Sequence, residues 1–303
     1  MARFERKSLI KEMATSRYFR FVRLARLDKP VGSYLLLWPT LSALWLASRG
    51  WPGWHLFLVF TLGTLLTRSA GCVVNDIADR KFDGLVKRTI NRPIPSGDIK
   101  VFEALIFMSL ICLLALLLVV TTNLNTVLLA FLGATIAGIY PYMKRYTYVP
   151  QIILGIAFSF GIPMAFTAVN NEVNKLAGLL FIANLIWIVS YDTEYAMVDR
   201  DDDLKIGLKS SAILFGDLDK FIIGILQLGF ISSLLLVWKT ANLHWPFLIG
   251  ILIAIMILSY QQILIKERRR DRCFKAFLIN HWLGLILFLS IVLDLFFYTE
   301  GVT

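Results

Sequence analysis

Long apolar segments separated by short charged loops make up most of this chain of 303 residues. An α-helix needs about 20 predominantly apolar residues to cross a bilayer. Nine segments meet this requirement: 31–48, 55–75, 102–121, 124–141, 149–169, 176–198, 221–238, 245–263 and 275–297. The gap around Asn123 leaves the alternative of one long kinked segment, but roughly 40 residues is too long for a single crossing. The pattern predicts an all-α, polytopic membrane protein with nine transmembrane helices.

The composition supports a membrane protein and excludes several soluble classes. Hydrophobic residues make up 57% of the chain and charged residues only 17%, which is too apolar for one soluble core. A net charge of +10 would suggest a nucleic-acid partner in a soluble protein, but here the basic residues lie between membrane-length segments, so we expect none. The three cysteines are scattered and odd in number, which argues against both a disulfide framework and a metal site.

The positions of Lys and Arg predict how the chain is oriented. Of the 31 basic residues, 27 fall in the N-terminal segment and in the loops after the second, fourth, sixth and eighth apolar segments. The positive-inside rule therefore places the N-terminus in the cytoplasm and the C-terminus on the far side. Residues 1–29 are predicted to form a basic amphipathic segment on the cytoplasmic leaflet, with a solvated tail as the alternative for residues 1–12. Residues 30–303 are predicted to form a single transmembrane domain.

Acidic residues gather in two stretches, each at the cytoplasmic end of a predicted membrane helix. Two features recur in the same order: Asp79 and Asp83 return 120 residues later as Asp199 and Asp203, and Gly97-Asp98 returns 119 residues later as Gly216-Asp217. Four predicted helices separate the copies, and this even number leaves both copies on the same membrane face. We infer a parallel repeat of two four-helix halves followed by a ninth helix.

The spacing within each stretch predicts a row of side chains on one helix face. The first row, at i, i+4 and i+8, consists of Asn75, Asp79 and Asp83. The second row, at i, i+3, i+7 and i+11, consists of Asp192, Tyr195, Asp199 and Asp203. Glu194 and Asp201 would lie on the opposite face. Unpaired carboxylates in such rows repel one another, and oxygen ligands favour a hard divalent cation, so we expect Mg²⁺ shared with a phosphate group. For Asp76, Asp98, Asp201 and Asp217, a solvated helix end or cap is an equally good interpretation.

Basic residues stand close to both acidic stretches. They are Lys87, Arg88 and Arg92 after the first, Lys205 and Lys209 after the second, and Lys144 and Arg145 in the loop after the fourth apolar segment. Carboxylates that hold Mg²⁺ beside Lys and Arg on short loops are typical of a diphosphate site. The positive-inside rule alone also accounts for some of these residues.

The sequence resembles the UbiA superfamily of intramembrane aromatic prenyltransferases. The resemblance is carried by RLDKPVGSYLLLWPTLSALW at 26–45, NDIADRKFDGLVKRTINRPIPSG at 75–97 and YDTEYAMVDRDDDLKIGLKSSAILFG at 191–216. It covers nearly the whole chain and is strongest to the branch that prenylates 4-hydroxybenzoate in ubiquinone synthesis. It implies Mg²⁺-dependent transfer of a polyprenyl group from polyprenyl diphosphate to the 3-position of 4-hydroxybenzoate, in a bacterial inner (cytoplasmic) membrane.

The resemblance also implies a role for individual residues. Asn75, Asp79, Asp83, Asp199 and Asp203 match the positions that bind the Mg²⁺ ions bridging to the diphosphate, and Asp76 would assist within the first motif. On the loop that follows Tyr140, Arg145 matches a position for the aromatic acid. Asp192 and Tyr195 are candidates for handling the phenol proton.

Two alternatives to this function remain open at the level of sequence. A divalent-cation or proton-coupled transporter would also carry acidic rows and a repeat, although its ionisable residues should lie near mid-membrane. A sister prenyltransferase would use haem, a naphthoate or homogentisate as acceptor. For either prenyltransferase, the candidates for an aromatic lining of the cavity are Phe158, Phe160, Phe166, Phe181 and Trp187.

Overall fold

The computed structural model describes residues 17–86 and 89–299 and is a bundle of helices. Among these residues, nine helical spans are long and apolar enough to cross a membrane, which confirms the predicted number. The helices are α2 (Arg17–Leu24), α3 (Val31–Ser48), α4 (Gly53–Ala78), α5 (Val101–Val119), α6 (Leu124–Met143), α7 (Pro150–Ser159), α8 (Gly161–Asn170), α9 (Lys175–Ile206), α10 (Ser211–Phe215), α11 (Asp219–Thr240), α12 (Trp245–Ile265) and α13 (Arg270–Thr299), with short 3₁₀ turns at Asp83–Leu85 and Gly216–Leu218.

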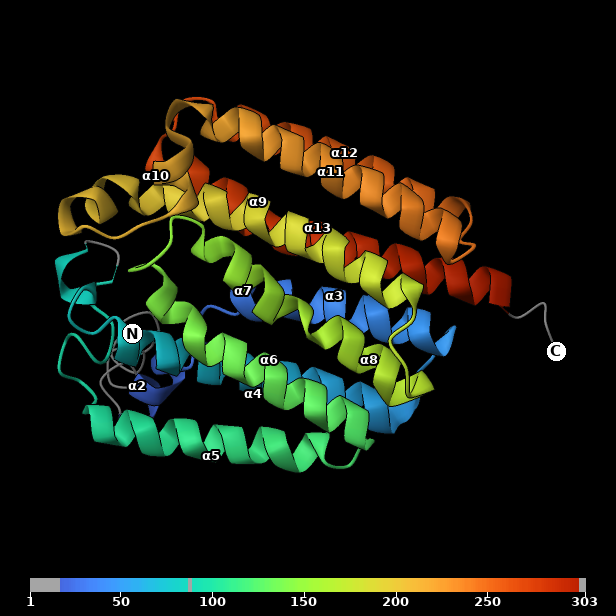
Figure 1. Cartoon of the computed structure of the whole chain (residues 1–303), viewed down its shortest axis with the longest axis horizontal. Coiled ribbons are helices and arrows are strands. Elements are labelled where there is room, and N and C mark those ends of the chain that lie inside the picture. Colours follow the sequence, from blue (N-terminus) through green and yellow to red (C-terminus); the bar gives the residue numbers. More distant parts are fainter. Residues whose placement is uncertain (1–16, 87–88, 300–303) are drawn as a thin grey trace, which may run out of the picture.

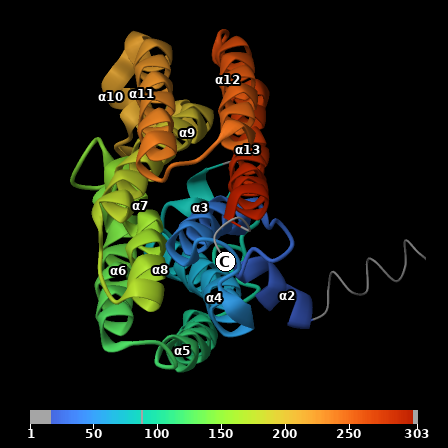
Figure 2. The ribbon, with the colours of Figure 1, turned by 90° about the vertical axis from the view of Figure 1, so that its right-hand side faces the viewer.

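The helices run side by side, with α3 near the centre of the bundle (Figures 1 and 2). Helix α3 packs against α13, α8 and α4, while α9 packs against α11 and α13. Helix α5 lies at the edge and contacts mainly α4, and only 11% of its span is buried. Because its remaining surface is apolar, α5 is suited to face lipid.

The fifth span is broken into α7 and α8 at Phe160. Pro163 has no backbone N–H and cannot complete the hydrogen bond to Ser159, which weakens the helix at this point. Gly161 allows α8 to approach α3 closely, because a Cβ atom there would lie 2.3 Å from Oγ1 of Thr40. The break gives the cavity described below part of its wall.

Two helix ends differ from the predicted boundaries. Helix α9 continues to Ile206, eight residues beyond the expected end, and stops where Gly207 adopts a left-handed conformation with φ 74°. Helix α4 ends at Ala78, so Asp79 is its C-cap and Asp83 lies in a separate 3₁₀ turn. The prediction of one continuous helical row for Asn75, Asp79 and Asp83 is therefore wrong.

The repeat has a counterpart in backbone geometry. Gly97 and Gly216 have φ values of 79° and 54°, in the left-handed region that favours glycine. The segment before α5 and the segment after α10, which contain these glycines, lie at the same end of the molecule as α2, opposite the C-terminal end of α13 (Figure 1).

The described part of the N-terminal segment packs on the transmembrane helices. Leu24 is fully buried, and the ring of Phe21 packs at a tilt against that of Phe107 of α5, with centroids 5.0 Å apart. Arg20 donates to the backbone oxygen of Asp98 and Arg17 to the carboxylate of Glu103. These arginines contact the segment before α5 and the first turn of α5. Residues 1–12 lie outside the described part.

Candidate active site

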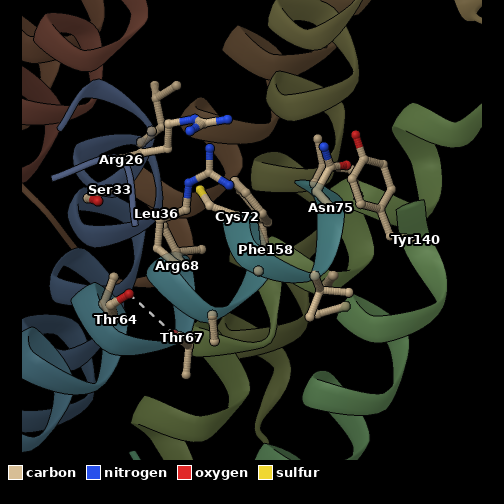
Figure 3. A pocket seen from close by; sticks show the side chains of 18 of the residues that line it. Arg26, Ser33, Leu36, Thr64, Thr67, Arg68, Cys72, Asn75, Tyr140 and Phe158 are labelled. Carbon is tan, nitrogen blue, oxygen red and sulfur yellow. Dashed lines mark hydrogen bonds between the residues drawn. The ribbon is translucent and has the colours of Figure 1, made fainter. Parts of the chain in front are cut away.

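One large cavity of about 1100 Å³ lies between the helices, and both acidic stretches contribute to its wall. Its polar lining includes Asn75 and Asp76 of α4, Lys144 after α6, and Asp192 and Tyr195 of α9. Its apolar lining comes largely from α4, α5 and α6, with a smaller part from α7. The cavity therefore joins a charged region to an apolar chamber (Figure 3).

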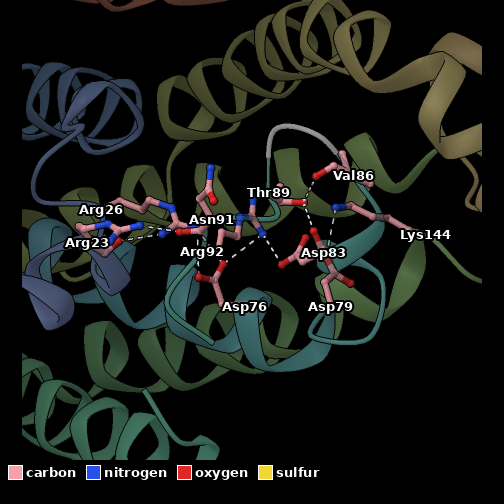
Figure 4. A network of polar contacts seen from close by, with 10 residues as sticks. All are labelled: Arg23, Arg26, Asp76, Asp79, Asp83, Val86, Thr89, Asn91, Arg92 and Lys144. Atoms are coloured by element: carbon pink, nitrogen blue, oxygen red, sulfur yellow. Dashed lines mark hydrogen bonds and ion pairs between the residues drawn. The ribbon is translucent and has the colours of Figure 1, made fainter. Parts of the chain in front are cut away.

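A network of ion pairs holds the first acidic stretch (Figure 4). Arg26 donates to both carboxylate oxygens of Asp76, at 2.8 and 3.0 Å. Arg92 lies 3.1 Å from Asp76 and 2.7 Å from Asp83. All three aspartates of this stretch are buried, with exposures of 1% for Asp76, 4% for Asp79 and 6% for Asp83. Burial raises the pKa of the Asp83 carboxyl above its ordinary value, while the Arg92 guanidinium opposes that shift.

The turn after α4 returns Asp83 to the vicinity of Asp79. The Asp83 N–H donates to the Asp79 carbonyl at 2.9 Å, and the Thr89 hydroxyl donates to the Asp83 carbonyl at 2.7 Å. The carboxylates thus gather through a capped turn and not through helical periodicity.

The second acidic stretch lies on one continuous helix, α9, as its spacing predicted. Asp192 and Tyr195 face the cavity, and the ring of Tyr195 lies 4.6 Å from that of Phe277 on α13. Asp199 and Asp203 follow on the same helix and are half-buried.

Residues of α9 that do not line the cavity attach the helix to its neighbours. Arg270 pairs with Asp201 at 3.1 Å and with Asp202 at 2.9 Å. Asn280 of α13 donates to Glu194, which is fully buried. The prediction that Glu194 lies away from the active face agrees with these contacts, but the residue is part of the protein interior.

Lys144 lies between the two acidic stretches. Its ammonium is 3.4 Å from Asp79, and its carbonyl accepts from the Lys209 N–H at 2.9 Å. Burial lowers the pKa of Lys144, but neighbouring groups outweigh this effect and bring the pKa above its ordinary value. Among these groups are the Tyr140 phenol and the carboxylates of Asp79 and Asp203.

The other predicted basic residues have different surroundings. Arg145 donates to the Ala78 carbonyl at 2.8 Å, stacks on the Phe82 ring and does not line the cavity. Lys209 contacts the Tyr146 carbonyl and the Tyr148 ring, and Lys205 is exposed. Lys87 and Arg88 lie outside the described residues. Of the aromatic candidates, Phe158 and Phe160 line the cavity. Phe166 and Trp187 are core residues, and Phe181 contacts Phe160 edge-on.

Arg68, in the middle of α4, is a cavity residue to which the sequence assigned no role. Its guanidinium lies 5.4 Å from the Phe158 ring centroid, and its Nε is buried without a hydrogen-bond partner. No carboxylate of the described residues pairs with it. Figure 3 shows the side chains of Arg26 and Arg68 both directed into the cavity. A charged residue inside an apolar segment was the available sequence signal.

The donor atoms of both stretches suit a hard divalent cation. They are carboxylate and amide oxygens, the ligands that Mg²⁺ prefers. Asn75, Asp76 and Asp192 line the cavity, whereas Asp79, Asp83, Asp199 and Asp203 lie outside its lining. Within the described residues, no three acidic, His or Cys side chains converge closely enough to bind a metal ion. Arg92 and Lys144 instead provide the positive charge beside these carboxylates. Asp76 is held by two arginines, so it fits a positioning role better than direct binding of a metal ion.

Comparison with known proteins decides the family. The model of the UbiA prenyltransferase family matches residues 36–292. The chain belongs to this family. A 4-hydroxybenzoate octaprenyltransferase from Enterobacter sp. (strain 638) is 53% identical over 274 residues, covering 90% of this chain and 95% of that relative. The protein of the same name from Escherichia fergusonii is 52% identical over 282 residues, covering 93% and 97%.

Solved structures of UbiA homologues share the fold. The apo structure of a homologue from Aeropyrum pernix K1 has a TM-score of 0.77 and 22% identity, covering 86% of this chain and 97% of that one. A homologue from Archaeoglobus fulgidus, bound to GPP and Mg²⁺, has a TM-score of 0.69 and 17% identity, covering 90% and 99%. The chain is thus a multi-pass membrane protein with the UbiA fold.

Proposed function

We propose that this prenyltransferase transfers a polyprenyl group from polyprenyl diphosphate to the 3-position of 4-hydroxybenzoate, a step of ubiquinone biosynthesis. The observation that carries the proposal is the single cavity that joins both acidic stretches to an apolar chamber containing Arg68. The two relatives of more than 50% identity that carry the name 4-hydroxybenzoate octaprenyltransferase support this acceptor. The multi-pass fold places the reaction in a membrane, and we assign the bacterial inner membrane with a cytoplasmic N-terminus.

Asn75, Asp79, Asp83, Asp199 and Asp203 would hold Mg²⁺, which when bound neutralises the charge of the diphosphate. Arg92 and Lys144 would leave their present aspartate partners and contact diphosphate oxygens, because an anion competes with carboxylates for the same cations. Lys87, Arg88, Lys205 and Lys209 would add positive charge around the same region. These groups together favour departure of the diphosphate without a protein nucleophile.

The apolar chamber would protect the allylic cation that remains. Residues of α5 and α6 supply hydrocarbon walls, and the faces of Phe158 and Phe160 are available to stabilise positive charge. Nucleophilic side chains and water would otherwise trap the cation. The long isoprenoid tail can stay among apolar groups while its diphosphate reaches the charged region.

Arg68 is the best-placed cation for the carboxylate of the aromatic acid. It lies seven residues before Asn75 on α4, so helical rise puts it about 10 Å deeper than the first acidic stretch. This arrangement would place the acid beyond the diphosphate, with its phenol end toward Asp192 and Tyr195, which we propose to handle the phenol proton. Arg145 contacts the end of α4 instead, so its expected contact with the acid is less favoured.

The alternative acceptors and the transporter are less well supported. Haem, a naphthoate and homogentisate also carry carboxylates with which Arg68 could pair, so this residue does not separate the acceptors. The names of the two relatives of more than 50% identity favour 4-hydroxybenzoate. A transport function would not explain why Arg92 and Lys144 lie beside an apolar chamber. Family membership also favours a transferase.

The direct test uses purified protein in liposomes with a polyprenyl diphosphate, 4-hydroxybenzoate and Mg²⁺. We expect 3-polyprenyl-4-hydroxybenzoate by mass spectrometry, and none when EDTA is present. Consumption of the diphosphate without this product would support the proposed site of diphosphate ionisation but refute 4-hydroxybenzoate as the acceptor. Folded protein that leaves the diphosphate intact would refute the prenyltransferase proposal.

A further inference from the structure

Tyr191 has a buried hydroxyl group with no hydrogen-bond partner among the described residues. The residue is 2% exposed and lines the cavity from α9. Its ring is fixed by edge-on contacts with Trp187 and Phe277, whose centroids lie 5.4 and 5.9 Å away. The hydroxyl therefore cannot easily turn toward solvent, and an unmade hydrogen bond of this kind costs free energy.

The unpartnered atoms of Tyr191 and Arg68 belong to the same cavity. Nine buried side-chain atoms in the described chain lack a partner, and only the Tyr191 hydroxyl and the Arg68 Nε come from residues that line the cavity. Tyr191 lies eight residues before Asp199, and Arg68 seven before Asn75, so helical rise places them roughly 10–12 Å deeper than these two predicted metal ligands. Two hydrogen-bond donors from different helices thus stand at a similar depth.

We propose that the Tyr191 hydroxyl donates a hydrogen bond to the carboxylate of the aromatic acid and, with Arg68, selects acceptors that carry this group. The inference rests on the proposed function and adds a specificity-determining residue to it. A carboxylate accepts several hydrogen bonds, so one group satisfies both donors. Tyr195 lies four residues nearer to Asp199 than Tyr191 does, and Asp192 lies one residue nearer, which leaves these two residues the phenol end of the acceptor.

This arrangement makes the enzyme selective for acceptors with a carboxylate, because only these acceptors satisfy the hydrogen-bond donors of Arg68 and Tyr191. An acceptor without a carboxylate would leave Arg68 and Tyr191 unpaired in an apolar chamber, and such sites discriminate strongly against analogues that lack the required group. Trp187 and Phe277 fix the position of the hydroxyl, and Asn280 in turn accepts from the Trp187 indole at 2.8 Å. The selectivity therefore depends on the packing of α9 against α13.

The test compares Tyr191→Phe, which keeps the ring, with Tyr260→Phe, which removes a hydroxyl that contacts Lys275 outside the cavity. For Tyr191→Phe we expect at least about a tenfold rise in KM for 4-hydroxybenzoate, a factor that corresponds to about 1.4 kcal/mol. KM for the polyprenyl diphosphate should not change. With 4-hydroxybenzamide, which lacks the charge, the variant and the wild type should differ much less. Tyr260→Phe should match the wild type throughout.

A double variant tests whether the two residues share one ligand. If Arg68→Gln and Tyr191→Phe act on the same carboxylate, the double variant should lose less acid affinity than the product of the two single losses. Calorimetric titration of 4-hydroxybenzoate into the diphosphate-free protein gives this affinity without turnover.

The outcomes separate this inference from the function on which it rests. An unchanged KM for the acid in Tyr191→Phe, or an equal rise for both substrates, would overturn the role of Tyr191 while leaving the transferase intact. Wild-type protein that makes no prenylated acid would refute the proposed function itself. An unchanged thermal transition of the variant excludes misfolding as the cause of a raised KM.

Discussion

The Arg68 guanidinium lies directly against the backbone of Gly32. A Cβ atom at residue 32 would stand 2.5 Å from Nη2 and 2.8 Å from Nε of Arg68. Gly32 on α3 therefore creates the space in which the charged group of α4 reaches the cavity. The relationship explains why a residue without a Cβ atom fits at this position in the first turn of α3.

Gly32→Ala should displace the Arg68 guanidinium without unfolding α3, because only the end of a flexible side chain must move and alanine favours helix. We expect a several-fold rise in KM for the aromatic acid and little change for the diphosphate. Gly178→Ala on α9 is the matched control, since a Cβ atom there meets nothing within 4 Å. Equal kinetics of the two variants would contradict the proposed role of Arg68.

Asp79→Ala and Asp199→Ala should each abolish turnover and leave membrane insertion intact, because both carboxylates are needed to position Mg²⁺ beside the diphosphate. The measurement is product formation over a range of Mg²⁺ concentrations. Asp217→Ala is the control, because its side chain is 97% exposed. Wild-type rates in the two test variants would remove the metal assignment.

Arg145→Ala should affect the first acidic stretch more than the aromatic acid. The side chain supports the end of α4 through the Ala78 carbonyl and the Phe82 ring. We therefore expect kcat and the apparent Mg²⁺ requirement to worsen while KM for the acid changes little. A selective rise in KM for the acid would restore the acceptor role that the family resemblance implies.

Glu194→Gln should be nearly neutral for activity, because an amide oxygen can still accept from Asn280. Glu194→Ala should instead lower stability by about 1–3 kcal/mol, since it removes the acceptor of a buried donor. Thermal unfolding of the two variants in the same detergent compares these effects. Equal transition temperatures for Glu194→Gln and Glu194→Ala would show that the contact between Asn280 and residue 194 contributes nothing to stability.

The sequence by itself determined the number of membrane spans and the positions of the acidic stretches. Span length is a local property, because about 20 apolar residues are needed wherever the helix lies in the bundle. The row of Asp192, Tyr195, Asp199 and Asp203 was predictable for the same reason, since α9 is one uninterrupted helix. The row of Asn75, Asp79 and Asp83 was not predictable, because the backbone leaves the helix at Asp79 and hydrogen bonds in the following turn place Asp83 near Asp79.

Only the tertiary structure decided which side chains share the cavity. Lipid and protein interior are equally apolar, so the hydrophobic pattern of a membrane helix does not tell its lipid-facing side from its core-facing side. The approach of Gly32 to Arg68, the pairing of Asp76 with Arg26, and the cavity that Tyr191 and Arg68 share all bring together residues far apart in the chain. These contacts depend on how the helices pack, because no periodicity within a single helix specifies its neighbour.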